Sequence, residues 1–162
     1  MNEEDIARQQ AKILYEQAYR RQMRGELADA MVLYKRSIDM HPTAEAYTFL
    51  GWTYSMLRRY DEAIEACHQA IATDPSFGNP YNDIGAYLIE LERWEEAIPW
   101  FKKAIAAPRY EVPQYAYMNL GRVFERLGDV RAALANYNHA LEIAPFYLSA
   151  GWAKHLLLGK LN

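Results

Sequence analysis

The sequence predicts an all-α fold, a solenoid of stacked helix pairs, on the basis of three observations. First, a small motif recurs: Leu50-Gly51, Ile84-Gly85 and Leu120-Gly121 are each followed, twelve residues after the glycine, by an alanine. Second, apolar residues lie three and four positions apart, which is the spacing of amphipathic helices. Third, the segments between successive amphipathic stretches are only a few residues long, which favours antiparallel helix pairs.

The motif continues in the same way in each copy. After each alanine come an aromatic residue or a cysteine, then a second alanine, and soon afterwards a proline. These columns hold Ala63, Ala97 and Ala133; Cys67, Phe101 and Tyr137; Ala70, Ala104 and Ala140; and Pro75, Pro108 and Pro145. The pattern resembles the tetratricopeptide repeat, which has a period of about 34 residues. The resemblance implies a right-handed helical-repeat solenoid of four helix-turn-helix units plus a C-terminal capping helix.

The elements are expected in the following order within a single domain, 1–162. An N-terminal helical extension covers 1–10, where Ile6 continues the apolar spacing upstream. The repeats are expected at 11–43, 44–77, 78–113 and 114–147, and the capping helix at 148–162. The first repeat departs from the pattern, as a terminal unit should. Between the third and fourth repeats, the segment 107–113 is two residues longer, which is expected to lengthen one loop without breaking the stack.

Particular residues predict how each pair is held together. A glycine in the middle of a helix costs about 1 kcal/mol relative to alanine, so the recurring glycines predict close approach of the two backbones. Asp61 and Asp129 are expected to open second helices, where a side-chain oxygen or a negative charge satisfies the free amides. Cys67 occupies the slot of an aromatic residue, which predicts a buried packing role.

The capping helix leaves two interpretations open. Its run of leucines, Leu156 to Leu158, packs back on the fourth repeat as a lid, or forms an exposed apolar patch that pairs with another copy of the chain or a partner segment.

Composition and charge exclude several classes of function. The 162 residues are 51% hydrophobic with a net charge of −3, and both signs are mixed along the chain, so neither a nucleic-acid footprint nor an RNA-binding repeat is indicated. No apolar run reaches the length of a membrane helix, so no membrane partner is expected. The acidic start Glu3-Glu4-Asp5 is unlike an export signal, which predicts a cytoplasmic protein.

Catalytic and metal-binding patterns are not found. The four histidines are scattered without a pair at helical spacing, and there is no phosphate-binding glycine loop or nucleophile elbow. We therefore expect a protein that is not an enzyme and needs no metal or cofactor.

The resemblance implies where a partner binds. In tetratricopeptide arrays the first helices of successive repeats line a concave groove. At the positions that face this groove, the chain carries aromatic residues and methionines, with polar residues placed among them. The candidate groove residues are Tyr15, Tyr19, Trp52, Met56, Asn79, Asn82, Tyr115, Met118, Arg122 and Trp152. Such a mixture suits an extended or helical peptide, because aromatic rings supply contact area and asparagine bonds a peptide backbone.

The carboxylate clamp of co-chaperone repeats, which binds an acidic C-terminal tail, is not matched in either register. Where the clamp needs lysine, asparagine and arginine, the two registers read Tyr15, Tyr19, Phe49, Asn79 and Asp83, and Thr48, Trp52, Asp83, Tyr115 and Asn119. An asparagine ladder fails as well. Arg122 and Arg126, one turn apart, could hold an acidic residue, unless Glu90 and Glu125 neutralise them.

The sequence thus predicts a non-enzymatic adaptor that binds a peptide or protein segment in its groove. Two alternatives remain. One is a self-associating scaffold that forms a homodimer through the C-terminal helix, and the other is a chaperone-like adaptor for a secretion or assembly machine. The identity of the partner is not written in the repeat pattern.

Overall fold

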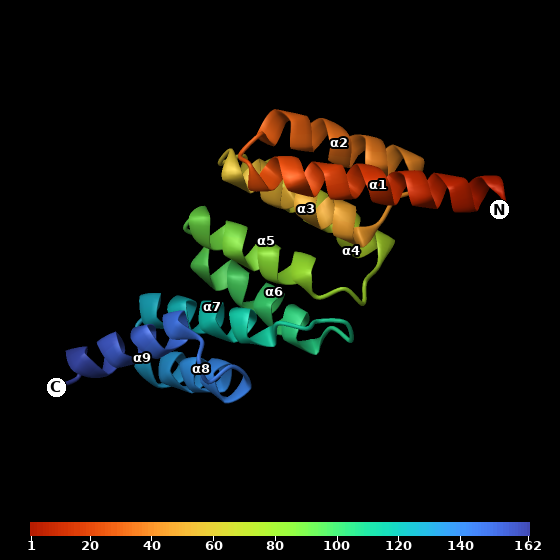
Figure 1. The fold of residues 1–162 in the computed structure, drawn as a ribbon. Coiled ribbons are helices and arrows are strands. Elements are labelled where there is room, and N and C mark those ends of the chain that lie inside the picture. Colours follow the sequence, from red (N-terminus) through yellow and green to blue (C-terminus); the bar gives the residue numbers. More distant parts are fainter.

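The computed structural model describes residues 1–162 and consists of nine α-helices, which confirms the all-α solenoid. The helices are α1 (Glu3–Met23), α2 (Leu27–Met40), α3 (Ala44–Met56), α4 (Tyr60–Thr73), α5 (Asn79–Glu90), α6 (Trp94–Ala106), α7 (Pro113–Arg126), α8 (Val130–Ile143) and α9 (Leu148–Lys160). Figure 1 shows them stacked in chain order, with the N-terminus and the C-terminus at opposite ends of the molecule.

The helices form two layers. The helices α1, α3, α5 and α7 each pack against the even-numbered helix that follows and contact one another in sequence, and α9 packs against α8. The odd-numbered helices therefore form a continuous inner layer, and the even-numbered helices cover it from outside (Figure 1).

The turns inside the pairs share a left-handed residue directly after the first helix. Gly25 and Gly128 have φ angles of 77° and 83°, and Arg58 and Glu92 adopt φ of 59° and 60° at the same place in the second and third pairs. Such a residue ends a helix by satisfying its last carbonyl groups. Only glycine adopts this conformation without steric cost, so Arg58 and Glu92 hold a strained backbone.

Asp129 opens its helix through a side-chain oxygen, whereas Asp61 supplies only a negative charge to the first turn of its helix. The Asp129 carboxylate accepts a hydrogen bond of 3.0 Å from the Ala132 N–H at the start of α8. In α4, the residue before the helix is Arg59, and Asp61 is already inside the first turn without a side-chain cap bond. Its charge still faces the positive end of the helix.

The glycines of the repeat motif make room, but for different neighbours. A Cβ at Gly85 would lie 2.6 Å from Cε1 of Phe101, and one at Gly121 would lie 2.3 Å from Cε1 of Tyr137. The expectation of close backbone approach is therefore wrong at these two positions, where an aromatic ring fills the space. It holds at Gly51, where the added Cβ would lie 3.0 Å from the Ala63 carbonyl oxygen.

Cys67 is fully buried in the main core, as predicted. Burial raises the pKa of its thiol well above the ordinary value, which makes the sulfur unreactive.

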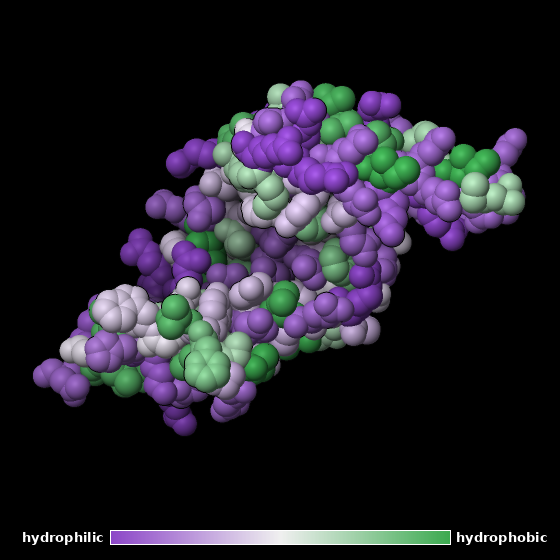
Figure 2. All heavy atoms as spheres, in the orientation of Figure 1, coloured by the Kyte–Doolittle hydropathy of each residue, from purple (hydrophilic) through white to green (hydrophobic).

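The leucines of α9 divide between the two interpretations. Leu157 is buried against Ala133 and Tyr137 of α8, so this residue acts as a lid. Leu156 and Leu158 are 47% and 40% exposed. Figure 2 shows apolar and weakly polar side chains gathered over α9 and the turn before it. None of the nine helices has both the length and the apolar character required to cross a membrane.

Candidate interaction groove

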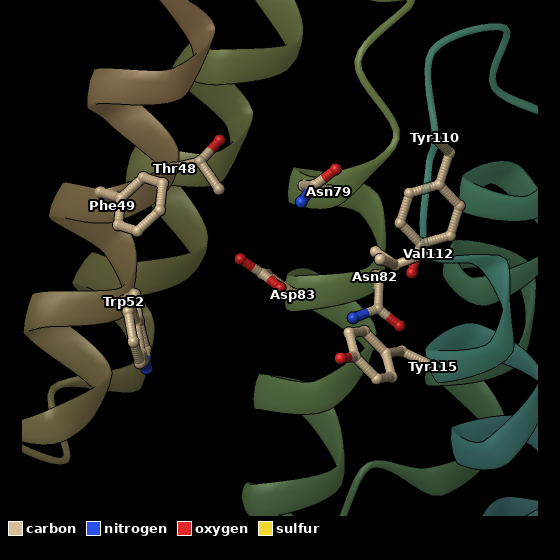
Figure 3. A pocket seen from close by; sticks show the side chains of 9 residues that line it. All are labelled: Thr48, Phe49, Trp52, Asn79, Asn82, Asp83, Tyr110, Val112 and Tyr115. Carbon is tan, nitrogen blue, oxygen red and sulfur yellow. The ribbon is translucent and has the colours of Figure 1, made fainter. Parts of the chain in front are cut away.

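A cavity of about 230 Å³ opens between α3, α5 and the start of α7. Its lining residues, drawn in Figure 3, are Thr48, Phe49, Trp52, Asn79, Asn82, Asp83, Tyr110, Val112 and Tyr115. In Figure 2 the surface is hollowed over α5, between the two ends of the solenoid. The cavity thus collects side chains from three successive helix pairs.

The wall formed by α3 is aromatic. The rings of Phe49 and Trp52 lie 5.7 Å apart between centroids, and Phe49 also contacts Tyr15 and Tyr19 of α1, each at 5.6 Å. These edge-to-face contacts hold Phe49 in place. Beside it lies a second hollow lined by Tyr15, Tyr19 and Phe49 together with Glu16 and Arg20. Phe49 therefore separates two neighbouring hollows of one groove.

The wall formed by α5 is polar and is connected to α7. Oδ1 of Asn82 accepts a hydrogen bond of 3.2 Å from Nδ2 of Asn119, and Oδ1 of Asn119 accepts one of 3.4 Å from Nη1 of Arg122. The three side chains form a chain across the two helices, which orients the amide of Asn82 at the cavity.

Of the two alternatives left open for Arg122 and Arg126, neutralisation by Glu90 and Glu125 is not observed. Glu125 instead accepts hydrogen bonds from the Tyr137 hydroxyl at 2.8 Å and from Lys160 at 3.1 Å. Arg126 lies 5.7 Å from the ring centroid of Trp94. Neither arginine forms a salt bridge.

Asp83 is the single carboxylate that lines the cavity. In Figure 3 its carboxylate points from α5 toward α3, into the space beside Phe49 and Trp52. Burial raises its pKa from 3.8 to about 7, and the Asn82 side chain opposes the change only in part. The carboxylate forms no salt bridge, so no cation of the chain stabilises its charge.

The third wall is the loop between α6 and α7. The Arg109 N–H donates to the Ser76 carbonyl and the Gly78 N–H donates to the Arg109 carbonyl, both at 3.0 Å, which joins this loop to the one between α4 and α5. A Cβ at Gly78 would lie 2.4 Å from Cβ of Tyr110. Glycine is required there because the Tyr110 side chain occupies that space.

Arg109 fixes this loop from outside the cavity. Its guanidinium group bonds Glu45 of α3 and Asp74 at the end of α4, both at 2.8 Å, and lies 4.3 Å from the ring centroid of Phe77. Hydrogen bonds from Ser76 and Arg109 lower the pKa of Asp74 to about 2. The longer loop is thus attached to both helices of the second pair, and it holds Tyr110 and Val112 at the cavity.

Tyr110 carries a polar group without a partner. Its hydroxyl oxygen is buried and has no hydrogen bond. An unpaired buried hydroxyl costs about 1–3 kcal/mol, so this wall of the cavity is formed at some cost to stability.

The structure divides the predicted site residues into groups. Trp52, Asn79, Asn82 and Tyr115 line the cavity together. Tyr15 and Tyr19 line the neighbouring hollow, and Arg122 reaches the cavity wall through Asn119. The remaining three are Met56, Met118 and Trp152.

These three residues lie outside the cavity. Met56 is 44% exposed, and its sulfur accepts a hydrogen bond of 3.5 Å from Gln22. Met118 is partly buried and packs against the cluster formed by Ala133, Tyr137 and Leu157 of α8 and α9. Trp152 is 64% exposed on α9, where it stacks on His155.

Sequence reasoning left five cavity residues out of its site: Thr48, Phe49, Asp83, Tyr110 and Val112. Phe49 and Asp83 share one repeat position, which the clamp comparison had considered only for asparagine and arginine. The signal for Tyr110 and Val112 was the extra length of their loop, together with Gly78. Elsewhere, no group of three or more histidine, cysteine, aspartate or glutamate side chains lies close enough to hold a metal ion.

The fold and the groove define a helical-repeat interaction module. Two models of the tetratricopeptide repeat match residues 44–77 and 77–145. The chain belongs to the tetratricopeptide repeat family. Members of this family are protein-interaction modules rather than enzymes, and this chain is a protein-interaction adaptor of that kind.

Individual relatives are distant. Anaphase-promoting complex subunit 6 of Arabidopsis thaliana is 27% identical over 143 residues, which cover 86% of this chain but only 26% of that protein. Among solved structures, pilF of Pseudomonas aeruginosa superimposes with a TM-score of 0.88 at 22% identity, covering 98% of this chain and 71% of that one. YrrB, a repeat protein with an unusual peptide-binding site, gives a TM-score of 0.68 at 21% identity, with coverage of 91% and 75%. At these identities the solved structures show the fold alone.

Proposed function

We propose that this adaptor binds an extended segment of a partner protein along the inner layer, with the cavity between α3, α5 and α7 as its main contact. The observation that carries the proposal is the convergence of aromatic and amide side chains from three helix pairs on one opening. A groove built from successive repeats is suited to a chain that runs along the stack.

The chemistry of the walls supports a peptide over a small polar ligand. Trp52 and Tyr115 are 39% and 44% exposed at the opening, so a bound segment can cover two rings that already have few rotamers to lose. Asn82 is oriented by Asn119, and its amide nitrogen, which lies beside the Asp83 carboxylate, has a second hydrogen to donate to a peptide carbonyl. In this combination, the rings supply affinity for the bound segment and the amide fixes its register.

The test uses a phage-displayed library of random dodecapeptides selected on the intact chain. We expect Trp52→Ala to weaken a selected peptide at least tenfold, and Asn82→Ala to weaken it severalfold, with helicity unchanged. The matched controls are Trp152→Ala, which removes an exposed ring outside the cavity, and Asn138→Ala, which removes an exposed amide on α8. Peptides that bind all four variants with the affinity of the parent chain would refute the groove.

Self-association through α9 is a second candidate. Phe146 and Leu148 are 94% and 85% exposed beside Trp152, and exposed apolar residues in a group are typical of contact surfaces. We expect sedimentation equilibrium to give a mass that rises with concentration, and Trp152→Ala with Leu148→Ser to abolish the rise. A monomer at every concentration would exclude this candidate.

The other expectations from the sequence stay predictions. A role in a secretion or assembly machine and a cytoplasmic location both depend on the unidentified partner, and the likeness to pilF extends to the fold only.

A further inference from the structure

The proposed function does not specify which side chain of the bound segment enters the cavity. We infer that the cavity receives one basic side chain, a lysine or an arginine, whose charge pairs with the Asp83 carboxylate. This inference rests on the proposed groove binding and adds the residue class that the groove selects.

The first argument is the charge of the lining. Asp83 is the only carboxylate, lysine, arginine or histidine among the nine lining residues. The nearby arginines are occupied elsewhere: Arg109 pairs with Glu45 and Asp74, and Arg122 bonds Asn119. The carboxylate therefore points into the cavity beside the Asn82 side chain but without an internal cation, and a basic guest would supply that cation (Figure 3).

The second argument is the shape and chemistry of the other walls. Phe49 and Trp52 present aromatic rings on the α3 side, toward which Asp83 points, and Tyr110 and Tyr115 line the same cavity on the α7 side (Figure 3). Aromatic faces attract ammonium and guanidinium groups, and their apolar surface accommodates the methylene stem of a long basic side chain. An acidic guest would meet the Asp83 charge in the same space and be repelled.

The third argument is size. The cavity of about 230 Å³ is smaller than the roughly 300–1,000 Å³ of sites that enclose a drug-sized molecule. It suits one side chain of a bound segment, while the rest of that segment lies along the open groove.

The pH dependence of binding follows from the surroundings of Asp83. The titratable groups that face it are Cys67 of α4, Tyr87 of α5 and Tyr110 of the loop, and burial raises the pKa of each of them. All three are neutral near pH 7, so Asp83 alone titrates there, with a pKa of about 7. A basic guest binds the ionised carboxylate, so its affinity is highest above pH 7 and falls about tenfold between pH 8 and pH 6.

The experiment continues from the dodecapeptides selected on the parent chain. We expect lysine or arginine to be enriched at one position of those peptides whose binding Trp52→Ala weakens. Replacing that residue by norleucine in a synthetic peptide should weaken binding to the parent chain at least tenfold. The same replacement should change binding to Asp83→Asn less than twofold, because the charge partner is already absent.

Two controls accompany this comparison. Asp61→Asn makes the same substitution at an exposed carboxylate outside the cavity, and it should keep both the lysine preference and the pH dependence of the parent chain. Asp83→Asn should bind the basic peptide with an affinity that no longer changes between pH 8 and pH 6. Circular dichroism checks that both variants are folded.

The outcomes separate the two proposals. Selected peptides that need Trp52 but carry no basic residue would overturn the basic subsite and leave groove binding standing. The same conclusion follows if Asp83→Asn prefers the lysine peptide over the norleucine peptide as strongly as the parent chain does. A library that yields no peptide dependent on Trp52 overturns both.

Discussion

Gly85 and Asp83 lie two residues apart on α5 and point to nearly opposite sides of that helix. Gly85 faces the interior of its helix pair, where the ring of Phe101 leaves no room for even a methyl group. Asp83 faces the groove, where its carboxylate meets an open cavity and no cation. One side of α5 is filled completely, and the other is left with unsatisfied groups.

The same contrast holds for hydroxyl groups elsewhere in the chain. In the interior, the Tyr34 hydroxyl donates to Gln22 at 2.7 Å, and the Ser37 hydroxyl donates to the Ala11 carbonyl at 2.7 Å. At the groove, the buried Tyr110 hydroxyl has no partner. Buried polar groups without a hydrogen-bond partner concentrate at functional sites, where a ligand can supply the missing contacts. The following changes test this difference between interior and groove.

The largest effect on the free energy of unfolding is expected from adding a methyl group to the filled interior of a helix pair. Gly85→Ala and Gly121→Ala should each lower the free energy of unfolding by about 2–3 kcal/mol, because the added Cβ overlaps the ring of Phe101 or Tyr137. Urea denaturation measures the change. The matched control is Gly151→Ala in α9, where the nearest atom is Leu141 Cδ2 at 3.9 Å; there the better helix propensity of alanine should stabilise by up to about 1 kcal/mol. Equal effects at the three sites would contradict the filled interior.

A change of opposite sign in the free energy of unfolding is expected from a substitution in the groove. The folded chain raises the pKa of Asp83 from 3.8 to about 7, so it binds this proton more tightly than the unfolded chain. The stability of the parent chain therefore declines as pH rises from about 4 through 7. Asp83→Asn removes the buried charge and should stabilise by about 2 kcal/mol at pH 8, allowing for partial exposure, and by almost nothing at pH 4.

A denaturation series over pH 4 to 8 checks this prediction, with Asp61→Asn as the control at an exposed carboxylate. If Asp83→Asn destabilised the chain at pH 8, the Asp83 charge would have a stabilising partner inside the molecule, and the contrast between the two faces of α5 would fail.

A smaller effect is expected at Gly51, where no aromatic ring lies against the glycine. A Cβ there would lie 3.0 Å from the Ala63 oxygen and 3.3 Å from Cys67 Sγ. Because this contact is only moderately tight and alanine favours the helix, Gly51→Ala should change the free energy of unfolding by less than about 1 kcal/mol. A loss as large as that of Gly121→Ala would show that the backbone, rather than the ring, sets the requirement for glycine.

The smallest effect is expected from removing the unpaired hydroxyl. Tyr110→Phe should leave stability unchanged or raise it by up to about 1 kcal/mol, since no hydrogen bond is lost. Tyr34→Phe makes the same change at a paired hydroxyl and should destabilise by about 1 kcal/mol. Thermal unfolding of the two variants side by side is the measurement, and a loss for Tyr110→Phe equal to that for Tyr34→Phe would reveal a partner for the Tyr110 hydroxyl.

The predictions from sequence were most accurate where the information is local. The helical spacing of apolar residues and the turns between them predicted the all-α solenoid, and the aromatic column predicted that Cys67 is buried. Repeat positions also brought Trp52, Asn79 and Asn82 to one cavity, because residues at equivalent positions of stacked units face the same side.

The predictions failed where residues distant in sequence meet. Gly85 and Gly121 meet the rings of Phe101 and Tyr137 rather than the backbone of the following helix. The sequence left open whether Glu125 neutralises the arginines, and in the structure Glu125 bonds Tyr137 and Lys160 instead. Neither result could be read from spacing, since both depend on which competing partner lies nearer in space.

The sequence by itself determined the helices and their pairing, because these follow from a period of 3.6 residues and from short turns. Only the tertiary structure decided what completes the groove. The loop between α6 and α7 folds back onto Ser76 and Gly78, Arg109 attaches it to α3 and α4, and Tyr110 and Val112 thereby line the cavity. Those contacts join different helix pairs, and a repeat pattern describes each pair alone.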